Sequence, residues 1–336
     1  MSVAERIIAR AQKAIREKVF PGCVIGLIRA NRRIVLPFGF LTYEQENAVR
    51  EDTIYDVASI TKSIPTASLA LTFIAEGKLS LSGLVREHLP ELQNDHDATI
   101  EDLLRYRVHG PRMAHLKYET FEEIRTHIFE NGFSGPPGDS AYTNLPAFLL
   151  GIILERVGGD PPAGGLSALA YRYFFEPLGM NDTTFFPSDP DGEKIMIYHN
   201  FIAPTEIVDG EEIRGIVHDE SARIFSRARR AVGHAGLFST APDLLKFAEA
   251  LLNGRLNVIV EGAEKGLGWP LDEPWRANKY GQKTFSKTGF TGTLIVVDRQ
   301  RGTAFVILSN RTYPHRPPDT SAINAFRTDI ADIVFS

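Results

Sequence analysis

Residues 283–310, KTFSKTGFTGTLIVVDRQRGTAFVILSN, contain three apolar segments separated by short turns. The segments Lys283–Lys287, Thr293–Asp298 and Thr303–Asn310 are rich in β-branched and aromatic residues, which favour strands. The tight turn Arg299-Gln300-Arg301-Gly302 joins the last two segments as a hairpin. The C-terminal part of the chain is therefore expected to form β-sheet.

Strands are also expected near the N-terminus, at Cys23–Arg29 and Arg33–Phe38, after an amphipathic helix that begins at the capping box of Ser2 and Glu5. Helical patterns lie between these two groups of strands and at the C-terminus, at residues 60–77, 145–157, 168–175, 243–252 and 320–335. Pro65 interrupts the first of them and is expected to kink that helix. Residues 181–230 show little periodicity and are expected to be irregular.

Strands at both ends with helices between them predict an α+β chain. Residues 1–55 and 231–336 are expected to form a sheet domain, and residues 56–230 a mostly helical domain with long loops. The chain has 336 residues, which is enough for two domains, and its hydrophobic and charged contents of 43% and 24% are those of a globular protein.

Composition excludes several classes of function. The net charge of −5 argues against nucleic-acid binding, and the single cysteine excludes an internal disulfide or a cysteine-based zinc site. No G-x-S-x-G, H-E-x-x-H or dinucleotide-binding glycine pattern is present, so no cofactor is expected. His218, Asp219 and His234 are compatible with metal ligands, but histidines satisfied within loops are commoner. The N-terminus resembles no signal peptide and no apolar stretch could span a membrane, which leads us to expect a cytoplasmic protein.

The segment Ser59-Ile60-Thr61-Lys62 is the first candidate for chemistry. At the start of a helix, residues three apart share a face with Cβ atoms ~5–6 Å apart. A serine hydroxyl becomes a nucleophile when a neighbouring base takes its proton, and a lysine can do this if burial or nearby positive charge lowers its pKa. Taken alone, the same four residues are more typical of an ordinary N-cap followed by a surface lysine.

Two further segments could complete such a site. Tyr142 and Asn144 lie in a turn before a helix, where a phenol could shuttle a proton and an amide could bind a substrate carbonyl; the same spacing recurs at Tyr198–Asn200. Lys287, Thr288 and Gly289 end a predicted strand, where an ammonium and a hydroxyl suit a substrate carboxylate and a glycine lets substrate backbone approach. Each segment by itself is also compatible with a purely structural role.

Together and in this order, these motifs resemble the serine β-lactamase and penicillin-binding protein superfamily, and specifically its class C β-lactamase-like branch. Three more segments share the resemblance, which extends over roughly residues 5–335: Glu176–Phe185, Gly233–Thr240 and Gly289–Thr293. The sequence departs from the family pattern after Leu103-Leu104, where Arg105-Tyr106-Arg107-Val108-His109-Gly110 follows.

The resemblance implies a β-lactamase/transpeptidase-like fold, in which a central antiparallel sheet flanked by helices and a mostly helical domain enclose the active-site cleft. It implies that Ser59 is the acylated nucleophile, Lys62 its base and Tyr142 a second proton-transfer residue. The implied substrate-binding residues are Asn144 for an amide, Lys287 and Thr288 for a carboxylate, and Gly289, with His234 lining the site. The N–H groups of Ser59 and Phe290 would form the oxyanion hole.

The sequence therefore predicts a cofactor-free serine hydrolase that acts on a small-molecule carboxylic ester or β-lactam through an acyl-serine intermediate. Lys287 favours a substrate that bears a carboxylate. Two alternatives stay open: a D-aminopeptidase or amidase acting on small D-amino-acid compounds, and a catalytically silent binding or scaffold homologue.

Overall fold

Five antiparallel strands in the order β2-β1-β9-β8-β7 form the central sheet of the computed structural model, which describes residues 1–113, 117–159, 165–187, 201–276, 279–281 and 283–336. The strands come from both ends of the chain, as the sequence predicted: β1 (Gly22–Arg29), β2 (Arg32–Gly39), β7 (Thr284–Thr288), β8 (Leu294–Asp298) and β9 (Thr303–Ser309). Thr288 pairs with Leu294 across β7 and β8, so the end of β7 lies beside the turn that leads into β8.

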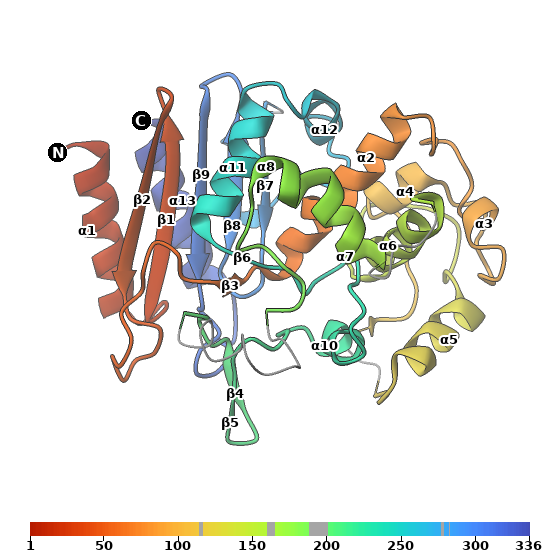
Figure 1. Cartoon of the computed structure of the whole chain (residues 1–336), viewed down its shortest axis with the longest axis horizontal. Helices are drawn as coiled ribbons and strands as arrows, with labels where there is room; N and C mark the ends of the chain where they lie inside the picture. The colour runs from red at the N-terminus through yellow and green to blue at the C-terminus, as the bar shows by residue number, and fades with distance from the viewer. Residues whose placement is uncertain (114–116, 160–164, 188–200, 277–278, 282) are drawn as a thin grey trace.

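Helices cover both faces of this sheet, which explains why strands β1, β8 and β9 are largely apolar and almost entirely buried. Helices α1 (Val3–Arg16) and α13 (Ser321–Phe335) lie side by side on one face, and α11 (Ala241–Leu252) packs on the other (Figure 1). The first face forms a small hydrophobic core with α1 and α13, whereas the second belongs to a larger core that continues into the helical part. The division into two domains therefore stays a prediction, because the larger core crosses the expected boundary.

Most of the remaining elements are helices on the side of the sheet that carries α11 (Figure 1), whereas the short turn at residues 274–276 contacts α13. The helices and helical turns are η1 (Ala58–Lys62), η2 (Ser63–Ala67), α2 (Ser68–Ala75), α3 (Val85–His88), α4 (Ile100–Leu104), α5 (Phe121–Asn131), α6 (Leu145–Val157), α7 (Gly165–Ala170), η4 (Tyr171–Phe175), α8 (Glu176–Leu178), α10 (Glu220–Arg227), α12 (Asn257–Ala263) and η5 (Pro274–Arg276). The short strands are β3 (Tyr55–Asp56), β4 (Glu206–Val208), β5 (Glu211–Ile213) and β6 (Phe238–Ser239). None of the helices in the described ranges is long and apolar enough to cross a lipid bilayer.

The expected helix over residues 60–77 is broken at Pro65. The chain forms a tight 3-10 turn, η1, then a wide turn, η2, and becomes regular only in α2. Ile64 has extended backbone angles (φ −121°, ψ 110°) because a proline offers no N–H and restricts the residue before it. The prediction of a single helix was therefore wrong, whereas the predicted kink at Pro65 was confirmed.

The expectation that residues 181–230 are irregular was also wrong in two places. Helix α10 follows the N-cap Asp219, whose carboxylate accepts a hydrogen bond from the N–H of Ala222. Strands β4 and β5 form a hairpin whose turn residues, Asp209 and Gly210, both have positive φ angles. Asp-Gly is a strong signal for such a turn, so the hairpin was detectable from the sequence.

Candidate active site

Ser59 lies in the turn η1, directly after strand β3. Asp56 accepts hydrogen bonds from the N–H groups of Ala58 and His218, each at 2.8 Å, and so fixes this turn. Ala58 has a left-handed backbone (φ 49°), which costs a residue with a side chain about 1 kcal/mol. Gly289 packs against the same turn, since a Cβ there would lie only 2.4 Å from the carbonyl oxygen of Val57. Gly289 thus lets the turn that carries Ser59 pack closely against the end of β7, in addition to the approach of substrate backbone that the sequence predicted.

Lys62 reaches back to Ser59 from the end of the same turn. Its Nζ lies 2.9 Å from Ser59 Oγ and 2.8 Å from the carbonyl oxygen of His234. Burial lowers the pKa of Lys62 to about 7, the ammonium of Lys287 adds to this, and the carboxylate of Asp219 opposes it. Near neutral pH, a large fraction of Lys62 is therefore an uncharged amine that can accept the serine proton.

Tyr142 brings a phenol to the same pair. Its ring centre lies 5.2 Å from Nζ of Lys62 and 4.2 Å from Nζ of Lys287. The side chain is 49% exposed, but desolvation of the phenol raises its pKa well above the ordinary value, against a hydrogen bond with Ser59 that lowers it. Tyr142 therefore stays protonated at neutral pH and can donate a proton. The alternative segment Tyr198–Asn200 lies outside the described residues.

The predicted carboxylate-binding pair is already engaged by a carboxylate of the chain itself. Oε1 of Glu273 accepts hydrogen bonds from the N–H of Thr288 at 2.7 Å and from its hydroxyl at 2.6 Å, and lies 3.5 Å from Nζ of Lys287. Oε2 accepts hydrogen bonds from Ser286 and Trp275. Burial alone would raise the pKa of Glu273, but Lys287 and these hydroxyl and N–H donors hold that pKa below its ordinary value, so the residue is a carboxylate.

Asn144 and His234 both contact Asp219. Asn144 donates from Nδ2 to Oδ2 of Asp219 at 3.0 Å, and Nε2 of His234 lies 3.3 Å from Oδ1, which also accepts from Ser221. Burial would raise the pKa of Asp219, but hydrogen bonds from His234, the Ala222 N–H and Ser221 hold it well below the ordinary value. Burial lowers the pKa of His234, so its ring is neutral.

The ring of His234 is completely buried, and the residue meets the catalytic lysine through its main-chain carbonyl. His234 is not among the residues that line the pocket over Ser59, and its expected role in the substrate site stays a prediction. The structure also assigns His218 a partner, Oε2 of Glu206 at 3.1 Å. In the described ranges, no three histidine, cysteine or acidic residues are grouped as metal ligands.

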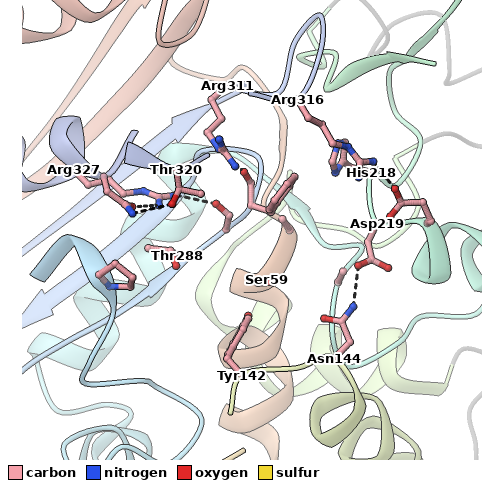
Figure 2. A pocket seen from close by; sticks show the side chains of 17 residues that line it. Ser59, Tyr142, Asn144, His218, Asp219, Thr288, Arg311, Arg316, Thr320 and Arg327 are labelled. Carbon is pink, nitrogen blue, oxygen red and sulfur yellow. Dashed lines mark hydrogen bonds and ion pairs between the residues drawn. The ribbon is translucent and has the colours of Figure 1, made fainter. Parts of the chain in front are cut away.

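A pocket of about 370 Å³ opens over Ser59 (Figure 2). Figure 2 shows Thr288, Thr320 and Arg327 on one side of Ser59 and Asn144, Asp219 and His218 on the other. Further lining residues include Tyr142, Gly289, Phe290, Arg311, Arg316 and Asn324. The structure thus brings the predicted nucleophile, phenol, amide and strand end to one pocket, and the buried Lys62 contacts the serine.

Comparisons with known proteins identify the family of this chain. The family model described as Beta-lactamase matches residues 5–329. This chain belongs to the beta-lactamase family. Esterase EstB of Burkholderia gladioli is 26% identical over 93% of this chain and 91% of its own length, and a putative D-alanyl-D-alanine carboxypeptidase of Escherichia coli (strain K12) is 27% identical over 83% and 73%. A crystal structure of a class C beta lactamase superposes with a TM-score of 0.74 at 16% identity, covering 98% of this chain and 97% of the other.

The comparisons confirm the predicted family, the predicted fold and the predicted class of enzyme, a serine hydrolase. In this member of the beta-lactamase family, the departing segment after Leu104 supports Tyr142. The Tyr106 ring centre lies 5.1 Å from that of Tyr142, and the Tyr106 carbonyl accepts a hydrogen bond from the N–H of Ala141. The unusual segment therefore forms the wall behind the phenol.

Sequence reasoning missed four groups of this beta-lactamase family site: Asp219 as a structural carboxylate, Glu273, Arg311 and Arg327. Only Asp219 had a local signal, because an aspartate before a helical segment is a typical N-cap. Arg223, in helix α10, donates to the carbonyl groups of Val217 and His218.

Proposed function

We propose that this chain hydrolyses a small carboxylic ester, or alternatively a β-lactam, through an acyl intermediate on Ser59. The observation that carries the proposal is the 2.9 Å distance between Nζ of Lys62 and Oγ of Ser59, combined with a pKa of Lys62 near 7. An amine with that pKa accepts a proton at neutral pH and returns it later, which is what acyl transfer requires of a general base.

The reaction would proceed in two halves. As Oγ of Ser59 forms a bond to the substrate carbonyl carbon, its proton passes to Nζ of Lys62, and the N–H groups of Ser59 and Phe290 would stabilise the oxyanion. When the bond to the leaving group breaks, Tyr142 supplies the proton that the leaving oxygen or nitrogen needs and is reprotonated from Lys62. A water molecule then attacks the acyl group, releasing the acid and restoring Ser59.

Two findings support an ester as the first choice. Esterase EstB matches nearly the whole chain, and Glu273 already takes the contacts of Lys287 and Thr288 that the sequence assigned to a substrate carboxylate. Hydrolysis of a D-amino-acid amide is the second candidate, because several relatives are named putative D-alanyl-D-alanine carboxypeptidases. A cytoplasmic location remains a prediction.

Intact mass spectrometry after treatment with a fluorophosphonate tests the nucleophile. Wild type and the exposed-serine control Ser82→Ala are expected to gain one adduct, whereas Ser59→Ala gains none. A panel of 4-nitrophenyl butanoate, a chromogenic cephalosporin and D-alanine 4-nitroanilide then ranks the substrates, and a burst of nitrophenol equal to the enzyme concentration is expected with the ester. An adduct that persists in Ser59→Ala, or a wild type that turns over none of the three, would overturn the proposal.

A further inference from the structure

A second pocket, of about 350 Å³, shares a wall with the pocket over Ser59. That wall is the turn formed by residues 232–235, whose two ends pair as a β-bridge. Val232 and Gly233 line the second pocket, whereas Ala235 lines the pocket over Ser59. A ligand in the second pocket would therefore touch the 232–235 turn without entering the proposed active site.

The 232–235 turn also holds the proposed base. The carbonyl group of His234 accepts a hydrogen bond from Nζ of Lys62, and that of Gly233 accepts one from Oγ1 of Thr66, both at 2.8 Å. Gly233 packs so closely against helix α6 that a Cβ there would lie 2.1 Å from the carbonyl oxygen of Ala147. Because closely packed groups transmit small shifts, a displacement of this turn would change the hydrogen bond to Lys62.

Aromatic side chains provide much of the lining of the second pocket. Phe225 contacts both Phe121 and Phe148, with ring centres 5.8 and 5.4 Å apart. Phe148 in turn contacts the buried ring of His234 at 6.0 Å, which gives the pocket another connection to the 232–235 turn. Ile152 adds aliphatic surface. A pocket of this size and lining suits the apolar part of a small molecule.

Three arginines also line the second pocket, Arg125, Arg156 and Arg230. Arg125 and Arg156 both pair with Glu91, so their two charges share one carboxylate. Arg230 is exposed, its guanidinium carbon lies 4.4 Å from the ring centre of Phe121, and it forms no ion pair within the described ranges. The positive charge around the pocket is therefore only partly balanced by these contacts.

Glu155 is the one acidic side chain among the described residues that line the second pocket. Its Oε1 accepts a hydrogen bond from the N–H of Leu166 at 2.9 Å. Burial raises the pKa of Glu155, and the N–H of Leu166 and the charges of Arg230 and Arg125 act against this. The three guanidinium groups thus meet two carboxylates, those of Glu91 and Glu155, which leaves one positive charge in excess. That excess favours an anionic ligand over a cationic one.

We propose that the second pocket binds a small amphipathic carboxylate, an apolar chain or ring that ends in a carboxylate, and that this ligand acts on Lys62 through the 232–235 turn. The apolar part would lie against Phe148 and Phe225, and the carboxylate beside Arg230. The proposed hydrolysis releases an acid, so the ligand belongs to the chemical class of its product. The effect on Lys62 rests on the proposed function, whereas the binding site does not.

Calorimetry with 4-phenylbutanoate tests the site, because this probe joins an aromatic ring to a carboxylate. The probe 4-phenylbutanamide has the same shape without the charge, and 4-phenylbutylamine carries the opposite charge. The titrations use the wild type and protein whose Ser59 carries a phosphonate adduct, which obstructs the first pocket. Both are expected to bind the carboxylate about fivefold more tightly than the amide, as one exposed ion pair provides.

Variants locate the binding. Arg230→Gln is expected to lose the preference for the carboxylate over the amide. Arg227→Gln is the matched control and is expected to keep it, because Arg227 is exposed at the end of α10 and does not line the second pocket. Ile152→Trp fills the apolar part and is expected to abolish binding of both compounds. Equal carboxylate affinities of the two arginine variants, tighter binding of the amine, or no binding at all would overturn the site.

The effect on Lys62 is measured as kcat of ester hydrolysis at saturating ester, with and without 4-phenylbutanoate. The acid is expected to change kcat by about fivefold in wild type and Arg227→Gln, a modest coupling between two sites. Arg230→Gln is expected to need about fivefold more acid for the same change. An acid that raises KM alone, equally in all three proteins, competes at Ser59 and overturns the coupling while the proposed hydrolysis stands. If no ester is turned over, the proposed function fails and calorimetry still decides the site.

Discussion

The charge of Lys287 adds to burial in lowering the pKa of Lys62, and the variant Lys287→Gln isolates the contribution of that charge. Nζ of Lys62 lies 5.2 Å and Nζ of Lys287 4.2 Å from the centre of the Tyr142 ring, so the two ammonium groups are at most about 9 Å apart. At an effective dielectric constant of about 20, two unit charges at that distance repel by roughly 1.8 kcal/mol, equivalent to about 1.3 in pKa. Removal of Lys287 is therefore expected to raise the pKa of Lys62 from about 7 to about 8 or higher.

The direction in which the pH profile of kcat/KM moves follows from the role of Lys62 as a base. Lys62 acts as a base only when neutral, so kcat/KM rises with pH through its pKa, and the acid limb moves upward in Lys287→Gln. At pH 7 the neutral fraction falls from about one half to about one twentieth, and kcat/KM falls roughly tenfold. The carboxylate of Glu273, left without its ammonium, acts in the same direction.

The assay is a pH profile of ester hydrolysis between pH 5 and 10. Lys283→Gln is the matched control, because Lys283 precedes the same strand but pairs with Glu264 on the surface. Its acid limb is expected to stay near that of wild type. A Lys287→Gln limb that remains at pH 7 or moves to lower pH would refute the assignment of Lys62 as the base.

Three other variants test the same electrostatic picture. Asp219→Asn removes a charge that raises the pKa of Lys62, so its acid limb is expected at lower pH than in wild type, opposite to Lys287→Gln; an upward shift contradicts this. Lys62→Met is expected to raise the free energy of unfolding near pH 7 by on the order of 4 kcal/mol, because the pKa of Lys62 is about 7 in the folded protein against an ordinary 10.5. Urea titrations should show that this increase in the free energy of unfolding becomes smaller as the pH approaches 10.5. Glu273→Gln leaves the buried Lys287 without its carboxylate and is expected to lower the free energy of unfolding by about 3 kcal/mol in the same titrations. The control Ser286→Ala removes only a hydrogen bond to Glu273 and is expected to lower it by about 1 kcal/mol. Equal effects of the two variants would contradict the importance of the ion pair.

The sheet could be predicted because its information is local. Strands β8 and β9 are short apolar runs separated by a turn with Gly302, and the observed bounds differ from the expected ones by one residue. Helix α10 was missed because it has eight residues and buries only Ser221, Ala222 and Phe225, which is too few for a periodic pattern. In the η1–η2 region, the apolar pattern favoured a helix, and the backbone restriction at Pro65 overrode it.

The residues of the candidate site also fall into two groups, those that a local sequence pattern predicts and those that it does not. Ser59 and Lys62 are three residues apart in one turn, so their spacing alone predicts contact. Glu273 meets Thr288 across a separation of fifteen residues and through a loop without periodicity, so no local pattern marks it. Arg327 occupies a position in α13 that a pattern assigns to the core, and its charge was informative only once its neighbours were known.

The charges around Ser59 act on the proposed base, Lys62. Burial and Lys287 make Lys62 a base near pH 7, and Glu273 neutralises Lys287 only through a 3.5 Å contact that it shares with Thr288. Glu273 therefore already takes the contacts at Lys287 and Thr288 that a substrate carboxylate would need. A second carboxylate bound directly at Lys287 would weaken the repulsion that lowers the pKa of Lys62, and more of the proposed base would then be protonated in the complex that reacts. The internal carboxylate thus occupies the place from which a substrate carboxylate would act on the lysine that has to remain neutral.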